Sequence, residues 1–358
     1  MLYRENGQFK SSYSADQAIF PIAQDRVFVI GILLVAFCGV PFVINEYWAN
    51  AILIPLLVYA LAGLGLNILT GYCGQVSLGT GAFMAVGAYA SFKLVGFFPE
   101  VNYLILIFFS GLVTAAVGVL FGLPSLRIKG FYLAVATLAA QFFLIWLFNK
   151  VGWFYDHSPT GMITVRPIDF FDIRVTGPEA TPAAKYLFTL TIIAVLTLAA
   201  KNIVRGRIGR SWMAIRDMDI AAELIGIKPL QAKLSAFAVS SFYIGVAGAL
   251  YFGVYLGSAE PLEAFDINQS FYVLFIIIIG GLGSILGAFL GAAFIVLLPI
   301  LMKNLMVGGF GVASGTAGHV EILLLGALII FFLIVEPHGL ARLWQIAKEK
   351  LRLWPFPH

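Results

Sequence analysis

Few residues in this 358-residue chain could do chemistry, and most of them are uncharged polar side chains beside long apolar runs. Asn67, Gln75, Ser77 and Gln141 carry amide or hydroxyl groups that could hydrogen-bond a solute crossing a membrane. They are therefore candidates for lining a translocation path. The same groups could simply join one helix to another. The glycine-rich break that holds Gln75 and Ser77 could also be an ordinary cytoplasmic turn.

Patterns typical of catalysis and metal binding are missing from the sequence. No G-x-x-x-x-G-K-S/T phosphate-binding loop is present. His157, His319, His338 and His358 lack the spacing of metal ligands. No nucleophile is paired with a base, so we expect a transport subunit rather than an enzyme. We also expect this chain to bind no metal and no cofactor, and any energy source to come from a partner.

The acidic residues offer little for coupling transport to an ion gradient. All 18 can be placed in loops or near the ends of apolar runs. A predicted outer loop holds three of them: Glu260, Glu263 and Asp266. Carriers driven by protons or sodium usually bury carboxylates within the membrane. The expected absence of an acidic residue at mid-membrane depth argues against a self-sufficient secondary carrier.

The composition places these side chains in a membrane. The chain is 61% hydrophobic and 11% charged, whereas a soluble domain carries about 25% charged residues. Many apolar runs approach roughly 20 residues, which is the length of a transmembrane helix. The sequence therefore predicts an all-α polytopic membrane protein with about ten transmembrane helices. The count is eight to ten, because the eighth and ninth spans are short and could be half-helices. Nothing indicates nucleic-acid binding.

The predicted organisation has three parts: a cytoplasmic segment 1–26, a transmembrane permease domain 27–340 and a cytoplasmic tail 341–358. Within the domain we expect a cytoplasmic loop 201–233 and a periplasmic loop 149–185. The predicted spans are residues 27–44, 48–69, 80–98, 103–121, 131–148, 186–200, 234–256, 271–280, 285–302 and 320–335.

The loop 201–233 has the highest density of positive charge. It holds seven of the 22 basic residues of the chain, and the positive-inside rule therefore places it in the cytoplasm. If the chain begins in the cytoplasm and crosses the membrane ten times, most of the other basic residues also lie on the cytoplasmic side. Both termini are therefore predicted to be cytoplasmic.

The middle of this loop is predicted to be a short helix. Asp217 fits the N-cap position and Gly226 the position after the last helical residue. A helix this short needs a surface on which to dock. It could rest on lipid headgroups, or it could fit a soluble cytoplasmic partner. Four apolar residues form one face of it: Ile220, Ala221, Leu224 and Ile225.

Several segments of the chain carry a recognisable pattern. The loop reads GRIGRSWMAIRD over 206–217, followed by Ala221-Ala222 and Gly226-Ile227. The break over 64–79 reads LGLNILTGYCGQVSLG, and 126–138 reads LRIKGFYLAVATL. The last two segments are GGLGS at 280–284 and EPHGL at 336–340. Together these segments, which cover most of residues 45–343 in order, resemble the LivM-type inner-membrane permeases of bacterial branched-chain amino acid ABC importers.

The resemblance implies a mechanism. The 217–226 helix would dock on one of two cytoplasmic ATPase subunits, which use ATP. A LivH-like second permease would complete the membrane part, and a periplasmic amino-acid-binding protein would deliver the solute to this inner-membrane complex. The residues that the resemblance assigns to ATPase coupling are Arg216, Asp217, Ala221, Ala222 and Gly226.

The resemblance implies branched-chain or related hydrophobic amino acids as solutes. Alternatives are urea or short amides and, as a less favoured possibility, a self-sufficient carrier. The second permease could be a homologue or another copy of this chain. One departure concerns the outer loop, where the family often has T-G-G-x-x-G-I and this chain has Ser-Pro-Thr-Gly-Met at 158–162. The first 25 residues also lie outside the resemblance.

Overall fold

The fold is an all-α bundle whose predicted class is confirmed. The computed structural model describes residues 11–12, 23–125, 132–170, 173–309, 314–336 and 338–353. Within these residues, ten helical segments are long and apolar enough to cross a membrane. Residues 126–131, which begin one of the family-like segments and include Arg127 and Lys129, lie outside the described residues.

The first half of the chain forms five of these segments, several of which contain π-helical turns (η). The elements are α2 (Ala23–Leu34), η1 (Val35–Gly39), α3 (Val40–Val43), η2 (Trp48–Leu53), α4 (Ile54–Asn67), η3 (Ile68–Tyr72), α5 (Thr80–Phe97), α6 (Tyr103–Ser125) and α7 (Tyr132–Lys150). A 3-10 turn, η4 (Gly152–Tyr155), follows α7.

The second half forms the other five, together with the loop helices. The elements are α8 (Pro182–Arg205), α9 (Arg207–Asp217), α10 (Asp219–Leu224), α11 (Pro229–Leu250), η5 (Tyr251–Leu256), α12 (Pro261–Ala264), α13 (Ile267–Gly280), α14 (Ile285–Lys303), η6 (Asn304–Gly309), α15 (Ser314–Val335) and α16 (Gly339–Leu353).

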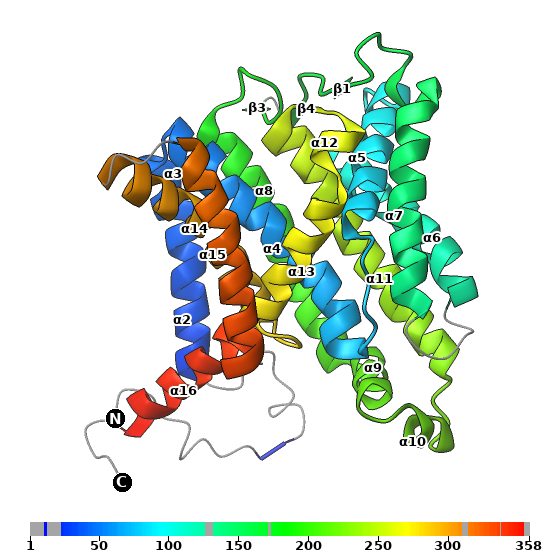
Figure 1. The fold of residues 1–358 in the computed structure, drawn as a ribbon, viewed down its shortest axis with the longest axis vertical. Coiled ribbons are helices and arrows are strands. Elements are labelled where there is room, and N and C mark those ends of the chain that lie inside the picture. Colours follow the sequence, from blue (N-terminus) through cyan, green and yellow to red (C-terminus); the bar gives the residue numbers. More distant parts are fainter. Residues whose placement is uncertain are drawn as a thin grey trace.

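Four two-residue strands lie at one end of the bundle. β1 (Ile163–Thr164) pairs antiparallel with β4 (Ser258–Ala259), and β2 (Asp169–Phe170) pairs antiparallel with β3 (Ile173–Arg174). The β1–β4 pair joins the 149–185 loop to the segment that follows η5. In Figure 1 the strands lie at the top, whereas α9, α10 and α16 lie at the opposite end.

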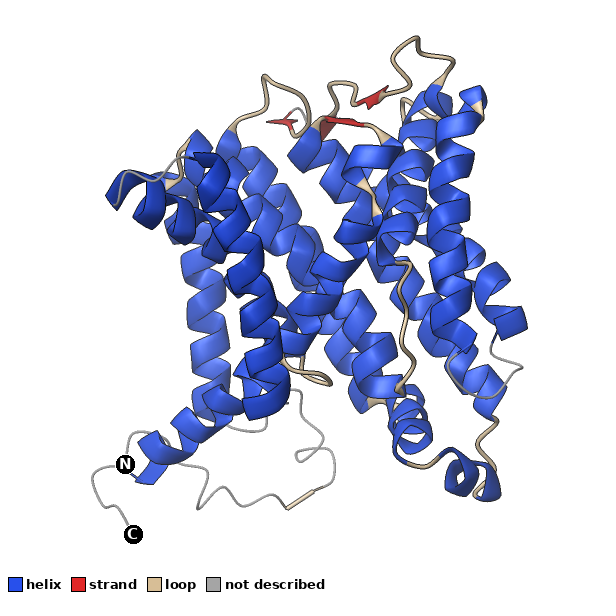
Figure 2. Cartoon of the chain, viewed as in Figure 1, coloured by secondary structure: helices blue, strands red, loops and turns tan. Residues whose placement is uncertain are grey.

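The centre of the bundle is formed by α4 and α11, the two segments that are most completely buried among the ten. Figure 2 shows that helices make up nearly all of the body and that the strands are confined to one edge. An all-helical interior is expected in lipid, because each helix satisfies its own backbone hydrogen bonds.

Two sequence-based boundaries are wrong. Asp217 does not cap the loop helix: it is the last residue of α9 and pairs with Arg216 at 2.8 Å. The chain is extended at Met218, with φ −159°, and α10 begins only at Asp219. The loop therefore contains two consecutive helices, because the side chain expected to start one is held by its neighbour instead.

The eighth span was predicted too short. The helical segment runs from Pro261 to Gly280, a length of 20 residues. The prediction began at Phe271 because acidic residues were interpreted as a loop. Instead, the Asp266 carboxylate accepts the backbone N–H of Gln269 at 3.0 Å and starts α13. A carboxylate at an N-cap stabilises a helix from its first turn.

Candidate functional site

The helices of the 201–233 loop are fastened to the bundle by side chains on α9 and α10. Trp212 is fully buried, and its indole N–H donates to the Ser235 hydroxyl of α11 at 2.9 Å. Asp219 forms an ion pair with Lys233 at 2.8 Å. The two helices therefore form a rigid extension of α11 rather than a free loop.

The end of α10 has the geometry predicted for Gly226. This glycine has φ +90°, which is unfavourable for residues with a Cβ. Its N–H donates to the carbonyl of Glu223 at 3.0 Å, and the N–H of Ile227 donates to that of Ala222 at 3.0 Å. This pair of bonds is the Schellman arrangement that ends a helix. Ala222 is buried, whereas Ala221 is exposed.

The outer face of α10 carries apolar side chains that no other described part of the chain covers. Their exposed fractions are 66% for Met218, 72% for Ile220, 83% for Leu224 and 75% for Ile225. Beside this face lies a groove of about 450 Å³, whose walls come from α9, the end of α10 and α11. A cluster of exposed apolar residues around a polar groove is typical of a surface that binds another protein.

Arg216 connects the cytoplasmic loop to the membrane breaks. One of its guanidinium nitrogens donates to the carbonyl of Gly71 at 2.9 Å. A Cβ on Gly74 would lie 3.0 Å from its side chain, and a Cβ on Gly283 would lie 3.4 Å from it. Both glycines have a positive φ. A displacement of α9 would therefore change the contacts of Arg216 with both glycine-rich breaks, at 71–79 and 280–284.

Asn67 fastens these two breaks together. Its side chain donates to the Ser284 carbonyl at 2.7 Å and accepts the Gly283 N–H at 2.8 Å. The residue is fully buried. Its amide is thus used for structure in this conformation, which corresponds to the helix-joining alternative. A role for Asn67 in lining a path stays a prediction.

Gln141, at the middle of α7, fastens this helix to the starts of α5 and α13. Its side-chain oxygen accepts the Ala82 N–H at 2.7 Å and the Ser270 hydroxyl at 2.9 Å, while its amide donates to the Phe265 carbonyl at 2.8 Å. Gln141 is the tenth of the 19 residues of α7. The starts of α5 and α13 are therefore level with the middle of a transmembrane helix.

The break that holds Gln75 and Ser77 is not a tight turn. The coil over 74–79 rises from the lower end of α4 to the start of α5, and Figure 2 shows it in tan. Ser77 is buried and bonds the Gly79 N–H at 3.5 Å, whereas Gln75 is half-buried. Irregular backbone at this depth is tolerated only against protein or water. A role for Gln75 or Ser77 in lining a translocation path stays a prediction.

A polar cluster that the sequence analysis did not predict lies between α4, η5 and α13. The Tyr59 hydroxyl of α4 is 3.4 Å from the Tyr251 hydroxyl and 3.2 Å from the side-chain nitrogen of Gln269. Tyr255 contacts Tyr251, with ring centroids 5.4 Å apart. Tyrosine occurs throughout apolar runs, so composition gave no signal; only the convergence of three segments reveals the cluster.

The expectation that no acidic residue lies at mid-membrane depth stays a prediction, and Asp266 is the residue that bears on it. Asp266 follows Phe265, whose carbonyl binds Gln141 in the middle of α7. A carboxylate is normally expelled from an apolar span, but here it is retained as the cap of α13.

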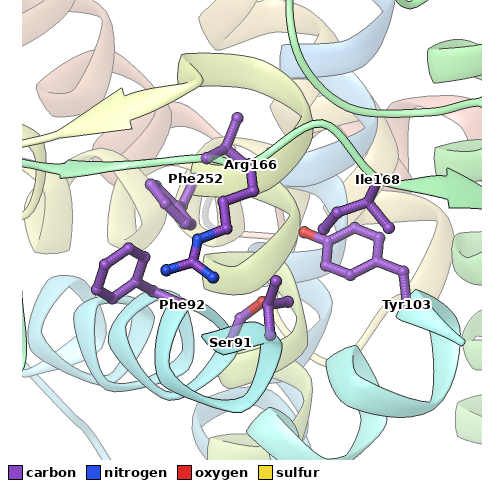
Figure 3. A pocket seen from close by; sticks show the side chains of 8 residues that line it. Ser91, Phe92, Tyr103, Arg166, Ile168 and Phe252 are labelled. Atoms are coloured by element: carbon purple, nitrogen blue, oxygen red, sulfur yellow. The ribbon is translucent and has the colours of Figure 1, made fainter. Parts of the chain in front are cut away.

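The outer end of the bundle has a small cavity beneath the 149–185 loop. It is bounded by α5, the start of α6 and η5, and the guanidinium of Arg166 points toward Ser91 and Phe92 (Figure 3). Its volume is about 10 Å³, roughly the space of one water molecule. An amino acid does not fit there, so this cavity is not a solute site in the conformation described.

Ion pairs stiffen the outer loop around this cavity. Lys93 pairs with Asp156, and Arg174 pairs with Asp169 at 3.1 Å and with Glu179. The hydrogen bond and charge of Asp169 raise the pKa of Arg174 above its ordinary value. Since Arg174 is exposed, solvent screens these pairs, and their role is to shape the loop.

The predicted residues therefore fall into two groups. One group lies at the end that carries α9 and α10, and Arg216 reaches from there to the breaks. It consists of Asp217 at the end of α9, Ala221 and Ala222 in α10, and Gly226 just after α10. The polar residues of the breaks and of α7 lie along a line from that end to mid-membrane depth. No group of three or more metal-ligating side chains occurs among the described residues.

Comparison with known proteins agrees with this arrangement. Residues 49–333 match the family model described as the branched-chain amino acid transport system permease component. The chain is 29% identical over 337 residues to the high-affinity branched-chain amino acid transport system permease protein LivM of Salmonella typhimurium. It is 28% identical to LivM of Escherichia coli. Each alignment covers 88% of this chain and 75% of the relative. No solved structure matches.

Proposed function

Because this chain belongs to the permease component family of branched-chain amino acid transport systems, we propose that it is the permease of an ATP-driven importer of branched-chain or related hydrophobic amino acids. It is a multi-pass membrane protein and a transport subunit. The proposed complex lies in the bacterial inner membrane, with both ends of this chain on the cytoplasmic side. It contains two cytoplasmic ATPase subunits, which use the ATP, and a LivH-like second permease.

The observation that carries this proposal is the uncovered apolar face of α10 on a rigid support. Four apolar residues on or beside a six-residue helix are more than 60% exposed, and so short a helix is marginal without a partner. In Figure 1, α10 lies beyond α9 at the extreme end of the molecule. This position favours a soluble partner over lipid headgroups.

The proposed mechanism follows the contacts inward from α10. Closure of the ATPase subunits on ATP moves α10 and α9 together. Arg216 passes that movement to Gly71 and to the neighbouring turn at Gly283, and Asn67 keeps the two breaks moving as one unit. A periplasmic binding protein delivers the amino acid at the opposite end, where β1 and β4 pair.

The test is Gly226→Pro in the full complex. Proline fixes φ near −65° and removes the N–H that bonds Glu223, so the end of α10 is distorted. We expect the chain to insert in the membrane while co-purification of the ATPase and ATP-dependent leucine uptake into proteoliposomes are lost. The control is Gly226→Asn, because asparagine tolerates a positive φ and no atom lies within 4 Å of an added Cβ.

Other outcomes separate the alternatives. Normal ATPase co-purification with Gly226→Pro would contradict the docking role of α10. A wild-type complex that hydrolyses ATP and imports urea or acetamide but no leucine would assign it to the short-amide class. Uptake by this chain alone without ATP would establish a self-sufficient carrier.

A further inference from the structure

The carboxylate of Asp266 lies beside the middle of a membrane-spanning helix. The carbonyl of the preceding residue, Phe265, binds Gln141 at the middle of α7, and a Cβ on Gly81 would lie 2.9 Å from the Asp266 carbonyl. α5 and α13 therefore both begin level with the middle of α7. A charged side chain at such a depth costs several kcal/mol or more if it faces lipid.

Among the described residues, the Asp266 carboxylate contacts uncharged groups and none of the ion pairs includes it. It accepts the Gln269 backbone N–H at 3.0 Å and the side-chain amide of Asn268. Asp266 is partly exposed and Asn268 is exposed at the surface of the chain. A carboxylate that is neither paired nor sealed in protein requires a polar surrounding, so this face meets water, a solute or a polar partner.

The surroundings of Asp266 suit a cation. Gln269, whose backbone binds the carboxylate, has its side chain at the Tyr59 hydroxyl, 3.2 Å away. Gln269 thus joins the carboxylate to Tyr59, whose ring lies 5.8 Å from that of Tyr251. Aromatic faces attract ammonium groups at distances up to about 6 Å. One negative charge beside tyrosine rings therefore forms a surface that is complementary to an ammonium group.

We propose that Asp266, together with Tyr59, Tyr251 and Gln269, receives the ammonium group of the amino acid halfway along the translocation path. This inference rests on the proposed function, since it takes an amino acid as the solute. The site also gives the chain a means of distinguishing α-amino acids from the corresponding acids that lack the amino group.

A polar track leads from this cluster to the cytoplasmic end. The coil over 74–79 starts beside Arg216 and ends next to Gly81. Within the described residues, the N–H groups of Val76 and Ser77 and the carbonyls of Val76, Ser77 and Leu78 form no hydrogen bond with the chain. Unsatisfied backbone at membrane depth faces water or solute, so the path continues along this coil.

The test measures water access and charge at the site without relying on transport. Asn268→Cys is introduced with Cys38→Ser, because Cys38 is an exposed native thiol and Cys73 is buried. The purified full complex is reacted with a quaternary-ammonium methanethiosulfonate and with a sulfonate methanethiosulfonate. We expect the cationic reagent to react about tenfold faster, because a unit negative charge adjoins the thiol.

Two further variants make the result specific. Adding Asp266→Asn should remove the preference for the cationic reagent, while adding Glu263→Gln, an exposed residue of the same acidic segment, should leave it unchanged. A thiol that reacts with neither reagent, or a preference that persists in Asp266→Asn, would overturn the inference. Co-purification of the partner subunits with each variant verifies that the complex is intact.

Uptake by the same preparations separates this inference from the proposed function. We expect Asp266→Asn to reduce leucine uptake at least tenfold while ATP hydrolysis without solute continues, and Glu263→Gln to transport normally. If the wild-type complex imports no amino acid but the charge-dependent labelling is found, the proposed function fails and the polar path remains. If leucine is imported equally by the wild type and Asp266→Asn, the ammonium site fails and the importer remains.

Discussion

At the scale of single residues, buried amides hold the irregular segments in place. Asn67 satisfies one N–H and one carbonyl of the Gly280–Ser284 turn, and Gln141 satisfies groups from α5 and from the α12–α13 junction. A buried backbone group without a partner costs about 1–3 kcal/mol. Breaks in membrane helices are therefore stable only where such side chains bond the freed backbone groups.

Replacing Asn67 tests this role. Asn67→Leu keeps the volume but leaves two buried backbone groups of the turn unbonded. We expect the free energy of unfolding to fall by about 2–4 kcal/mol. The measurement is the temperature at which a thiol-reactive dye reaches the buried Cys73 in a Cys38→Ser background. Asn202→Leu, at an exposed position on α8, is the control and should unfold at the wild-type temperature. Equal stability of both variants would contradict the structural role.

At the scale of elements, close helix contacts depend on glycine. A Cβ on Gly87 of α5 would overlap the carbonyl oxygen of Gly245 on α11, and a Cβ on Gly248 of α11 would overlap that of Met84. Small residues at crossings let helices pack by van der Waals contact, which replaces the hydrophobic driving force in lipid. These contacts hold α5 directly against α11.

A single methyl group should disturb this crossing. We expect Gly87→Ala to destabilise the purified protein by about 1–3 kcal/mol, because the backbones must separate. Gly96→Ala on the same helix is the matched control, since no atom lies within 4 Å of its added Cβ, and it should be neutral or slightly stabilising. The same dye assay reports both. A Gly87→Ala protein as stable as the control would show that the crossing adjusts freely.

At the scale of the whole molecule, the two ends differ in character. One end carries the basic loop with α9 and α10, and the other carries the paired strands and the ion pairs of Lys93 and Arg174 (Figure 1). A short basic loop is retained in the cytoplasm during insertion. The ends are therefore expected to lie on opposite sides of the membrane.

Thiol labelling in whole cells tests this orientation. In a Cys38→Ser background, Ser158→Cys in the 149–185 loop should react with a membrane-impermeant maleimide in spheroplasts. Met218→Cys, whose native side chain is 66% exposed, should react only after the membrane is permeabilised. The opposite pattern would invert the topology and rule out ATPase docking at α10. Reaction of both thiols in permeabilised cells controls for access.

The sequence alone determined the fold class, the ten candidate spans and the presence of a helix ending at Gly226. These features follow from local properties: the length of an apolar run must match the bilayer, and a glycine with a positive φ ends a helix cheaply. The family resemblance was likewise visible in short ordered segments, and the match over residues 49–333 confirms it.

Only the tertiary structure decided what the polar residues do. Asn67 and Ser284 are 217 positions apart, and Gln141 and Phe265 are 124 apart, so no local pattern reveals that they bond. For the same reason, Asp266 could be taken for a loop residue, although it caps α13 beside the middle of α7. Whether a polar group binds protein or faces a path depends on what lies opposite it in space, and that is set by packing.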